Sequence, residues 1–180
     1  MVFSDGDIIV IGGLGENCRM LASCERYSVN DDQWKLLPDL KVPAMNSSVC
    51  VFNDRFLYKF GGNKENEELA NCIERLDLQA GTEWEIVNLI NCSLPGLTSS
   101  GCAFQVNRDS ILFFGGTYDM YSQKSDKIWL CKVQKHGLEM TEIEETLPIA
   151  EGFWMQQSIV FNNSGIRLVG INWKFTVFKM

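Results

Sequence analysis

The start of the sequence contains a glycine pattern whose spacing imitates a cofactor site. Residues 8–15 read as an apolar strand that ends in Gly13-x-Gly15, as at the start of a dinucleotide-binding fingerprint. That fingerprint requires a third glycine, which would fall at Cys18, and a helix after it. Because the same strand and glycine pair recur twice without this context, we expect no cofactor here.

His136 is the only histidine among the 180 residues, so any histidine chemistry would depend on it. A Ser-His-Asp arrangement would rest wholly on this residue, and the sequence has no G-x-S-x-G turn to present a serine nucleophile. A copper oxidase site would need at least two histidines, which the count excludes. We therefore predict no catalytic residues and place His136 with Lys135 and Gly137 in a solvated turn.

Cysteine usage bears on both redox state and metal binding. The seven cysteines are odd in number and form no C-x-x-C pair, which fits neither a disulfide scaffold nor a zinc site. We expect free thiols, mostly buried, in a reducing intracellular compartment. They are Cys18, Cys24, Cys50, Cys72, Cys92, Cys102 and Cys131.

Two clusters of carboxylates, at residues 65–68 and 139–145, are candidates for calcium ligands. Neither has the D-x-D-x-D-G spacing of a calcium loop, so we interpret them as a solvated loop and a charged edge strand. The formal charge of −7 and the isoelectric point near 4.8 argue against nucleic acid as a partner. No apolar run approaches the ~18 residues of a membrane span, and the N-terminal segment lacks the basic residues of a signal peptide. The sequence thus predicts a cytoplasmic protein without membrane insertion.

An internal repeat organises the chain. An apolar strand that ends in two glycines occurs three times, and the first glycines lie at Gly12, Gly61 and Gly115, at intervals of 49 and 54 residues. A degraded fourth copy has Gly170 at the first glycine position. Nine residues before each first glycine, an apolar run ends, and turn residues such as Asn, Asp or Gly follow it. This order is a hairpin signal.

Each copy also carries two large side chains downstream of the glycine pair. Tyr27 and Trp34 hold these positions in the first copy, and Leu76 and Trp84 in the second, while the third has leucine at both. Each copy therefore offers four short strands, and four antiparallel strands at a period of about 50 residues predict an all-β propeller.

This pattern resembles the kelch repeat family, and the resemblance extends over nearly the whole chain. It implies kelch-type propeller blades, in which the glycine pair supplies positive φ angles and the Trp packs one sheet on the next. The residues that match the structural motif are Gly12, Gly13, Tyr27, Trp34, Gly61, Gly62, Trp84, Gly115 and Gly116.

The repeat predicts one kelch domain over residues 1–180, with blades at about 1–45, 46–97 and 98–150 and a partial blade at 151–180. Three blades of four strands and one of three give 15 strands, with no strand left over to close a ring. We therefore expect an incomplete or open propeller, which a partner chain or a second copy completes.

Function in such a scaffold is expected in loops that differ between blades. The loops after the glycine pairs (residues 14–23, 63–71 and 117–125) and the connections between blades (38–47, 91–100 and 146–153) should share one face. We predict a scaffold or adaptor that binds protein partners there; ligase, cytoskeletal and assembly roles stay open, as do a structural subunit and, less favoured, a sugar isomerase or specifier enzyme. The predicted partner-binding residues are Arg19, Met20, Lys64, Glu65, Tyr118, Asp119, Met120 and Tyr121.

Overall fold

The computed structural model describes most of the chain. The described residues are 1–4, 6–90, 96–119, 123–144, 146, 159–162, 165–169 and 175–178. Four residues named above lie outside them: Cys92, Met120, Tyr121 and Gly170.

The described strands form four antiparallel sheets, each made from strands that follow one another in the sequence. The first sheet contains β1 (Val2–Ser4), β2 (Asp7–Leu14), β3 (Met20–Ser28) and β4 (Gln33–Leu37). The second contains β5 (Ser48–Phe52), β6 (Phe56–Phe60), β7 (Ile73–Asp77) and β8 (Glu85–Ile86). The third contains β9 (Cys102–Gln105), β10 (Ser110–Phe114), β11 (Ile128–Gln134) and β12 (Gly137–Glu142). The fourth contains β13 (Ile159–Asn162), β14 (Gly165–Val169) and β15 (Phe175–Phe178).

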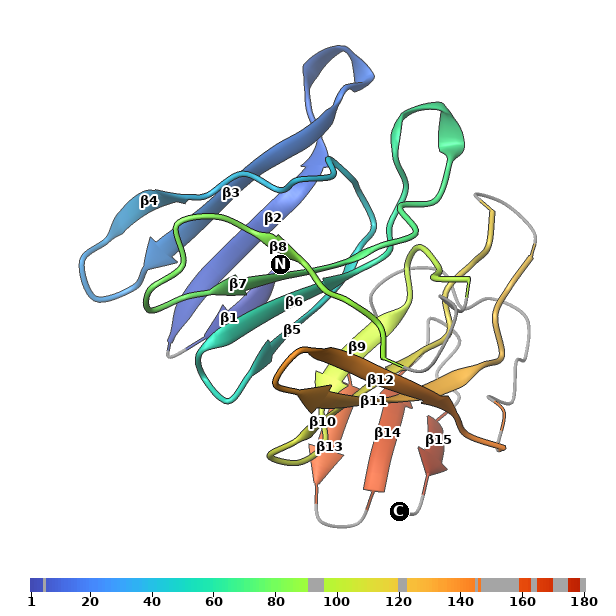
Figure 1. Cartoon of the computed structure of the whole chain (residues 1–180). Helices are drawn as coiled ribbons and strands as arrows, with labels where there is room; N and C mark the ends of the chain where they lie inside the picture. The colour runs from blue at the N-terminus through green and yellow to red at the C-terminus, as the bar shows by residue number, and fades with distance from the viewer. Residues whose placement is uncertain are drawn as a thin grey trace.

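The arrangement of the sheets confirms the predicted all-β fold of kelch-type blades. The first strands of the first three sheets lie beside one another, β1 against β5 and β5 against β9, so these strands form the inner edge of the blades. The sheets follow one another along an open arc and, within the described part of the chain, do not close into a ring (Figure 1). The only described helical turns are η1 (Glu16–Cys18) and η2 (Glu65–Glu67).

The glycine pairs at the end of the second strand of each complete blade, or directly after it, have backbones that favour glycine. All six glycines have positive φ, from 53° at Gly12 to 118° at Gly13. A Cβ on Gly12 would lie 2.5 Å from the carbonyl oxygen of Ala44, and one on Gly61 would lie 2.3 Å from that of Thr98. Both carbonyls belong to the connection that leads into the next blade, so the glycines allow the two backbones to touch.

Hydrogen bonds fix this contact between neighbouring blades. The Gly13 amide donates to the carbonyl of Ala44 (3.0 Å), and the Gly62 amide donates to that of Thr98 (3.3 Å). The Ser100 amide then donates back to the carbonyl of Asn46 (2.7 Å). Each connection is therefore bonded to the glycine pair of the blade before it, and the two connections are bonded to each other.

Apolar side chains fill the space between the first and second sheets. Trp84 is 0% exposed and lies among side chains of both sheets, and its indole Nε1 donates to the carbonyl of Pro38 (2.9 Å). The other fully packed members of this cluster are Ile9, Cys24, Leu40, Leu57 and Leu76.

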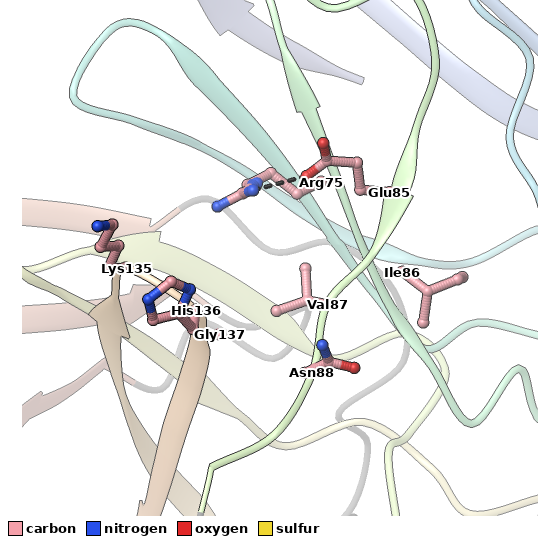
Figure 2. A pocket seen from close by; sticks show the side chains of 8 residues that line it. All are labelled: Arg75, Glu85, Ile86, Val87, Asn88, Lys135, His136 and Gly137. Carbon is pink, nitrogen blue, oxygen red and sulfur yellow. Dashed lines mark hydrogen bonds and ion pairs between the residues drawn. The ribbon is translucent and has the colours of Figure 1, made fainter.

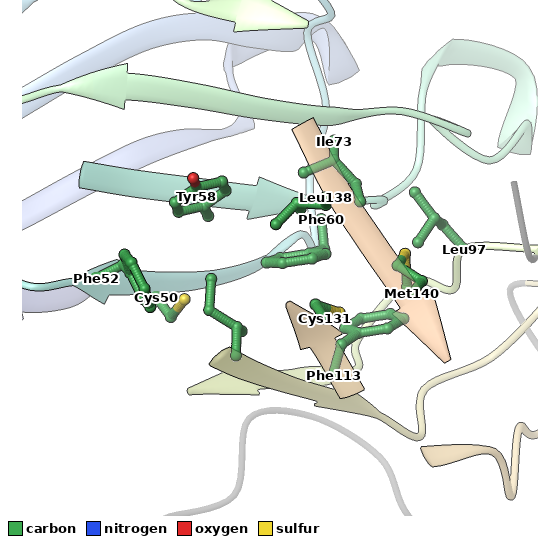
Figure 3. Close-up of a cluster of buried hydrophobic side chains, with 11 residues drawn as sticks. Cys50, Phe52, Tyr58, Phe60, Ile73, Leu97, Phe113, Cys131, Leu138 and Met140 are labelled. Carbon is green, nitrogen blue, oxygen red and sulfur yellow. The ribbon is translucent and has the colours of Figure 1, made fainter. Parts of the chain in front are cut away.

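A second cluster joins the second and third sheets (Figure 3). The rings of Phe60 and Phe113 stack at its centre, with centroids 5.2 Å apart. Leu138 stands where the first two copies have Trp, and it too is 0% exposed. The first three blades are thus joined by apolar packing as well as by backbone contacts.

Trp34 does not have the packed position that its match to Trp84 predicted. Its side chain is 53% exposed and contacts Tyr27, whose ring centroid is 5.1 Å away. The reason is positional: Trp84 packs on the face of the second sheet that the first sheet covers, and no described sheet covers the matching face of the first. Burial at this position therefore depends on the neighbouring blade and not on the residue.

A buried ion pair in the second blade was not predicted. The Nζ of Lys59 on β6 lies 2.8 Å from the Oε2 of Glu74 on β7, and both side chains are 0% exposed. The second carboxylate oxygen of Glu74 accepts the amides of Lys41 (2.8 Å) and Val42 (3.3 Å), in the connection from the first blade. The pair therefore satisfies both charges and binds the connection to the second sheet.

The glycine contact can be tested with two alanine substitutions that share a positive φ but differ in their surroundings. Gly61→Ala should lower the free energy of unfolding by at least ~2 kcal/mol, because the new Cβ meets a carbonyl as well as an unfavourable φ. Gly6→Ala should cost only about 1 kcal/mol, because its φ is +83° but nothing lies within 4 Å. Denaturant unfolding measures both; equal losses would contradict the close approach.

The two tryptophans give a second matched pair. Trp84→Ala should cost about 3–5 kcal/mol of stability, since it leaves a cavity between two sheets. Trp34→Ala should cost less than about 1 kcal/mol, since the side chain is half exposed. Chemical denaturation followed by circular dichroism measures both losses, and a loss below about 1 kcal/mol for Trp84→Ala would contradict its packing role.

Candidate functional site

The loops that follow the glycine pairs emerge at one end of the blades. β2, β6 and β10 all run toward this end, and the loops after β2 and β6 project beyond the sheets there (Figure 1). The first two connections between blades reach the same end, because Met45 bridges Asn63 and Ser99 bridges Thr117, just after the glycine pairs. Most of the third connection, residues 147–153, lies outside the described residues. We call this end the loop face.

The first two loops of the loop face have the same backbone, although we expected these loops to differ. Asn17 and Asn66 both have φ near 60° in the short turns η1 and η2. The Gly15 amide donates to the carbonyl of Arg19 (2.9 Å), as the Lys64 amide does to that of Glu68 (2.7 Å). The two loops therefore differ in side chains and not in shape.

Of the four predicted partner-binding residues in these two loops, two are exposed and two contact other residues of their own loop. Arg19 and Glu65 are exposed. Met20 is half-buried and pairs with Leu14 at the end of the β2–β3 ladder. Lys64 forms an ion pair with Glu68 (2.8 Å). Arg19 and Glu65 are thus the side chains best placed to meet a partner.

The third loop is held by contacts within itself. The amide of Tyr118 donates to the carbonyl of Gln123 (2.8 Å), and its hydroxyl lies 3.2 Å from that of Ser125. Asp119 accepts the amide of Gln123 (2.9 Å). Both predicted residues are half-buried, so the loop presents them partly and uses their polar atoms internally.

A cavity lies away from the loop face, in a place that the sequence did not indicate. It has a volume of about 120 Å³ and lies between the outer strands of the second blade and the β11–β12 turn of the third. β11 runs away from the loop face, so this turn marks the opposite end of the molecule. The lining residues are Arg75, Glu85, Ile86, Val87, Asn88, Lys135, His136 and Gly137 (Figure 2).

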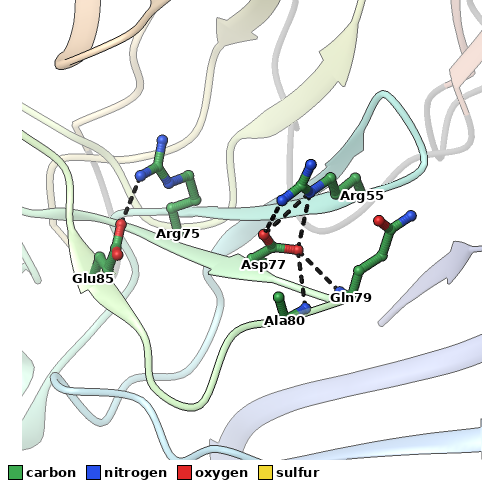
Figure 4. A network of polar contacts seen from close by, with 6 residues as sticks. All are labelled: Arg55, Arg75, Asp77, Gln79, Ala80 and Glu85. Atoms are coloured by element: carbon green, nitrogen blue, oxygen red, sulfur yellow. Dashed lines mark hydrogen bonds and ion pairs between the residues drawn. The ribbon is translucent and has the colours of Figure 1, made fainter.

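The guanidinium of Arg75 is positioned by its neighbours on the second blade. It donates to Glu85 (2.6 Å) and lies over the ring of Phe56, 5.3 Å from the centroid. Arg55 lies over the same ring but pairs with Asp77 (2.6 Å; Figure 4). This hydrogen bond, with the amide of Gln79, lowers the pKa of Asp77 to about 2. Arg55 is therefore engaged elsewhere, and Arg75 is the arginine that lines the cavity.

The histidine and cysteine side chains that a catalytic or metal site could use do not lie together. His136 lies in the exposed β11–β12 turn, as the sequence indicated. Burial raises the pKa of the Cys50 thiol to about 12, and that of Cys24 to about 11, which makes both poor nucleophiles at neutral pH. Among the described residues, no three His, Cys, Asp or Glu side chains are placed to hold a metal ion. No helix in the described part of the chain is long and apolar enough to span a membrane.

Comparison with known families agrees with the blade geometry. Residues 1–41 match the family model described as the kelch motif. The match spans the first blade, β1 to β4.

Two curated relatives match part of the chain. It is 30% identical over 101 residues to Kelch repeat and BTB domain-containing protein 2 of cowpox virus (strain GRI-90 / Grishak), a match that covers 51% of this chain and 18% of that protein. It is 40% identical over 55 residues to Kelch-like protein 38 of Rattus norvegicus, covering 31% and 9%. The chain thus spans less than a fifth of the length of these curated relatives.

A solved structure extends the likeness of the fold. The structure of YjhT superposes with a TM-score of 0.74 at 13% identity, over 93% of this chain and 56% of that one. At this identity the likeness concerns the fold alone.

Proposed function

We propose that this kelch chain is a protein-interaction scaffold and that its partner binds the loop face. The observation that carries the proposal is the common placement of the loops on stacked blades, with Arg19 and Glu65 exposed on neighbouring loops of one shape. A rigid frame with side chains that differ between equivalent positions suits recognition, since few rotamers need to be ordered on binding. Arg is also enriched at the centres of protein interfaces.

An enzymatic function has less support. Catalysis needs a polar cluster that converges on one reacting atom, with a nucleophile beside its base. Within the described residues, His136 lies at the end opposite the loop face, and Cys24 and Cys50 are buried thiols. The proposal therefore assigns binding, and not turnover, to this chain.

One observation favours a second role as a structural subunit. Leu36 is 81% exposed on the face of the first blade that no described sheet covers. Ile8 is half-buried and Trp34 is 53% exposed on this face, although it matches the buried face of the second blade. At the corresponding positions Leu57 and Trp84 are 0% exposed. We propose that another blade, from a partner chain or a second copy, covers this face and completes the propeller.

The loop face is tested by a quantitative pull-down from native lysate. We expect stoichiometric protein partners with the unmodified chain and at least about a tenfold loss with Arg19→Ala/Glu65→Ala, because interface residues of this kind carry much of the binding energy. The control is Arg108→Ala/Lys132→Ala, which removes two exposed charges outside the loop face. Equal recovery by all three chains would contradict the loop-face assignment.

The same experiment separates the other roles. A partner that the loop variant retains but Trp34→Ser/Leu36→Ser loses would support the subunit role. A monomer that binds no protein and turns over a metabolite would overturn both proposals.

A further inference from the structure

The cavity beside the β11–β12 turn has a fixed shape, because backbone contacts hold its two walls together. A Cβ on Gly137 would lie 2.2 Å from the carbonyl oxygen of Asn88, so the turn touches the second blade directly. The Leu138 amide donates to that same oxygen (2.9 Å), and the Ile90 amide donates to the carbonyl of Leu138 (2.8 Å). The walls come from two blades, yet they do not depend on mobile side chains for their spacing.

The lining of the cavity is cationic in a chain whose net charge is −7. Arg75 enters from the second blade, and Lys135 and His136 enter from the third (Figure 2). Glu85 is the one carboxylate in the lining and is paired with Arg75. In the part of the chain that is described, Lys135 and His136 have no hydrogen-bond or ion-pair partner, so their donors face the cavity or the solvent.

Arg75 keeps donors for a ligand despite its pairing. A guanidinium has five N–H donors, and the bond to Glu85 uses one. The ring of Phe56, 5.3 Å from the guanidinium, helps to hold the group in place. A pre-positioned arginine with an adjacent lysine and histidine is the arrangement that recognises an oxyanion.

We propose that this cavity binds an oxyanion carried by a peptide side chain, either a carboxylate or a phosphate ester. Arg75 and Lys135 supply the charge-assisted hydrogen bonds. His136 and the side-chain amide of Asn88 complete the set of donors. The volume of about 120 Å³ is several times that needed by one water, so a small anionic group enters without rearrangement.

The lip of the cavity points to a peptide as the carrier. Ile86 is 47% exposed and Val87 lines the same cavity, which places an apolar surface beside the cationic groups. A side chain that bears an oxyanion, next to an apolar residue of the same peptide, matches both features. This site lies at the end opposite the loop face, so it does not depend on the partner proposed there.

The test uses His136 as its own reporter, because a chain with one histidine gives one set of imidazole ring signals in proton NMR. The full chain is titrated at constant pH and ionic strength with N-acetyl-glutamate N-methylamide, with N-acetyl-phosphoserine N-methylamide and with sodium chloride. We expect a saturable shift with at least one of the two amides, with a dissociation constant on the order of millimolar for so small a probe, and none with chloride. Saturation by one amide alone identifies the source of the oxyanion.

Variants separate a built site from general charge attraction. Lys135→Gln, an exposed position in the turn, and Arg75→Gln should each weaken binding about tenfold, the effect expected for one charge-assisted hydrogen bond. Arg55→Gln removes an equal charge that is paired with Asp77 outside the cavity, and should leave binding unchanged. Thermal unfolding checks that the variants fold. The proposal would be overturned if the shift never saturates, or if Arg55→Gln weakens binding of the probe as much as Lys135→Gln does.

Discussion

The approach of a glycine pair to the connection into the next blade is the constraint on which the rest of the structure depends. Gly12 and Gly61 each lie so close to a carbonyl of that connection that no side chain fits between them. The neighbouring amides of Gly13 and Gly62 donate to the same carbonyls. Because this contact sets the spacing of the sheets, it also sets how much space remains for Trp84 on one side and for Phe60 and Phe113 on the other.

The buried pair of Lys59 and Glu74 depends on the same connection. A carboxylate shielded from water needs more hydrogen-bond donors than one ammonium group supplies, and here the amides of Lys41 and Val42 supply them. The connection thus contributes backbone donors to the sheet that follows it. The stacking of the blades, the buried ion pair and the apolar packing therefore all depend on the connections between blades. The loop face and the cationic cavity lie at opposite ends of the stacked blades.

The sequence predicted those features that each repeat determines by itself. The glycine spacing gave the blades, and the turn residues around His136 gave its exposed position. Features that need two blades were not predictable in the same way. Trp34 and Trp84 look alike in the sequence, yet only one is covered. Lys59 reads as an interruption of an apolar strand until Glu74 is seen opposite it. Arg75 and Lys135 are 60 residues apart and meet only because the blades stack.

The central claim is that the hydrogen bonds between glycine pairs and connections couple the blades, and amide hydrogen exchange measures it most directly. The account predicts that the amides of Gly13 and Gly62, which donate to the connections, exchange as slowly as those inside β6 and β10. They would then open only when the blades unfold together. Exchange of these two amides as fast as that of Asn66, in the exposed turn of the loop face, would contradict the account.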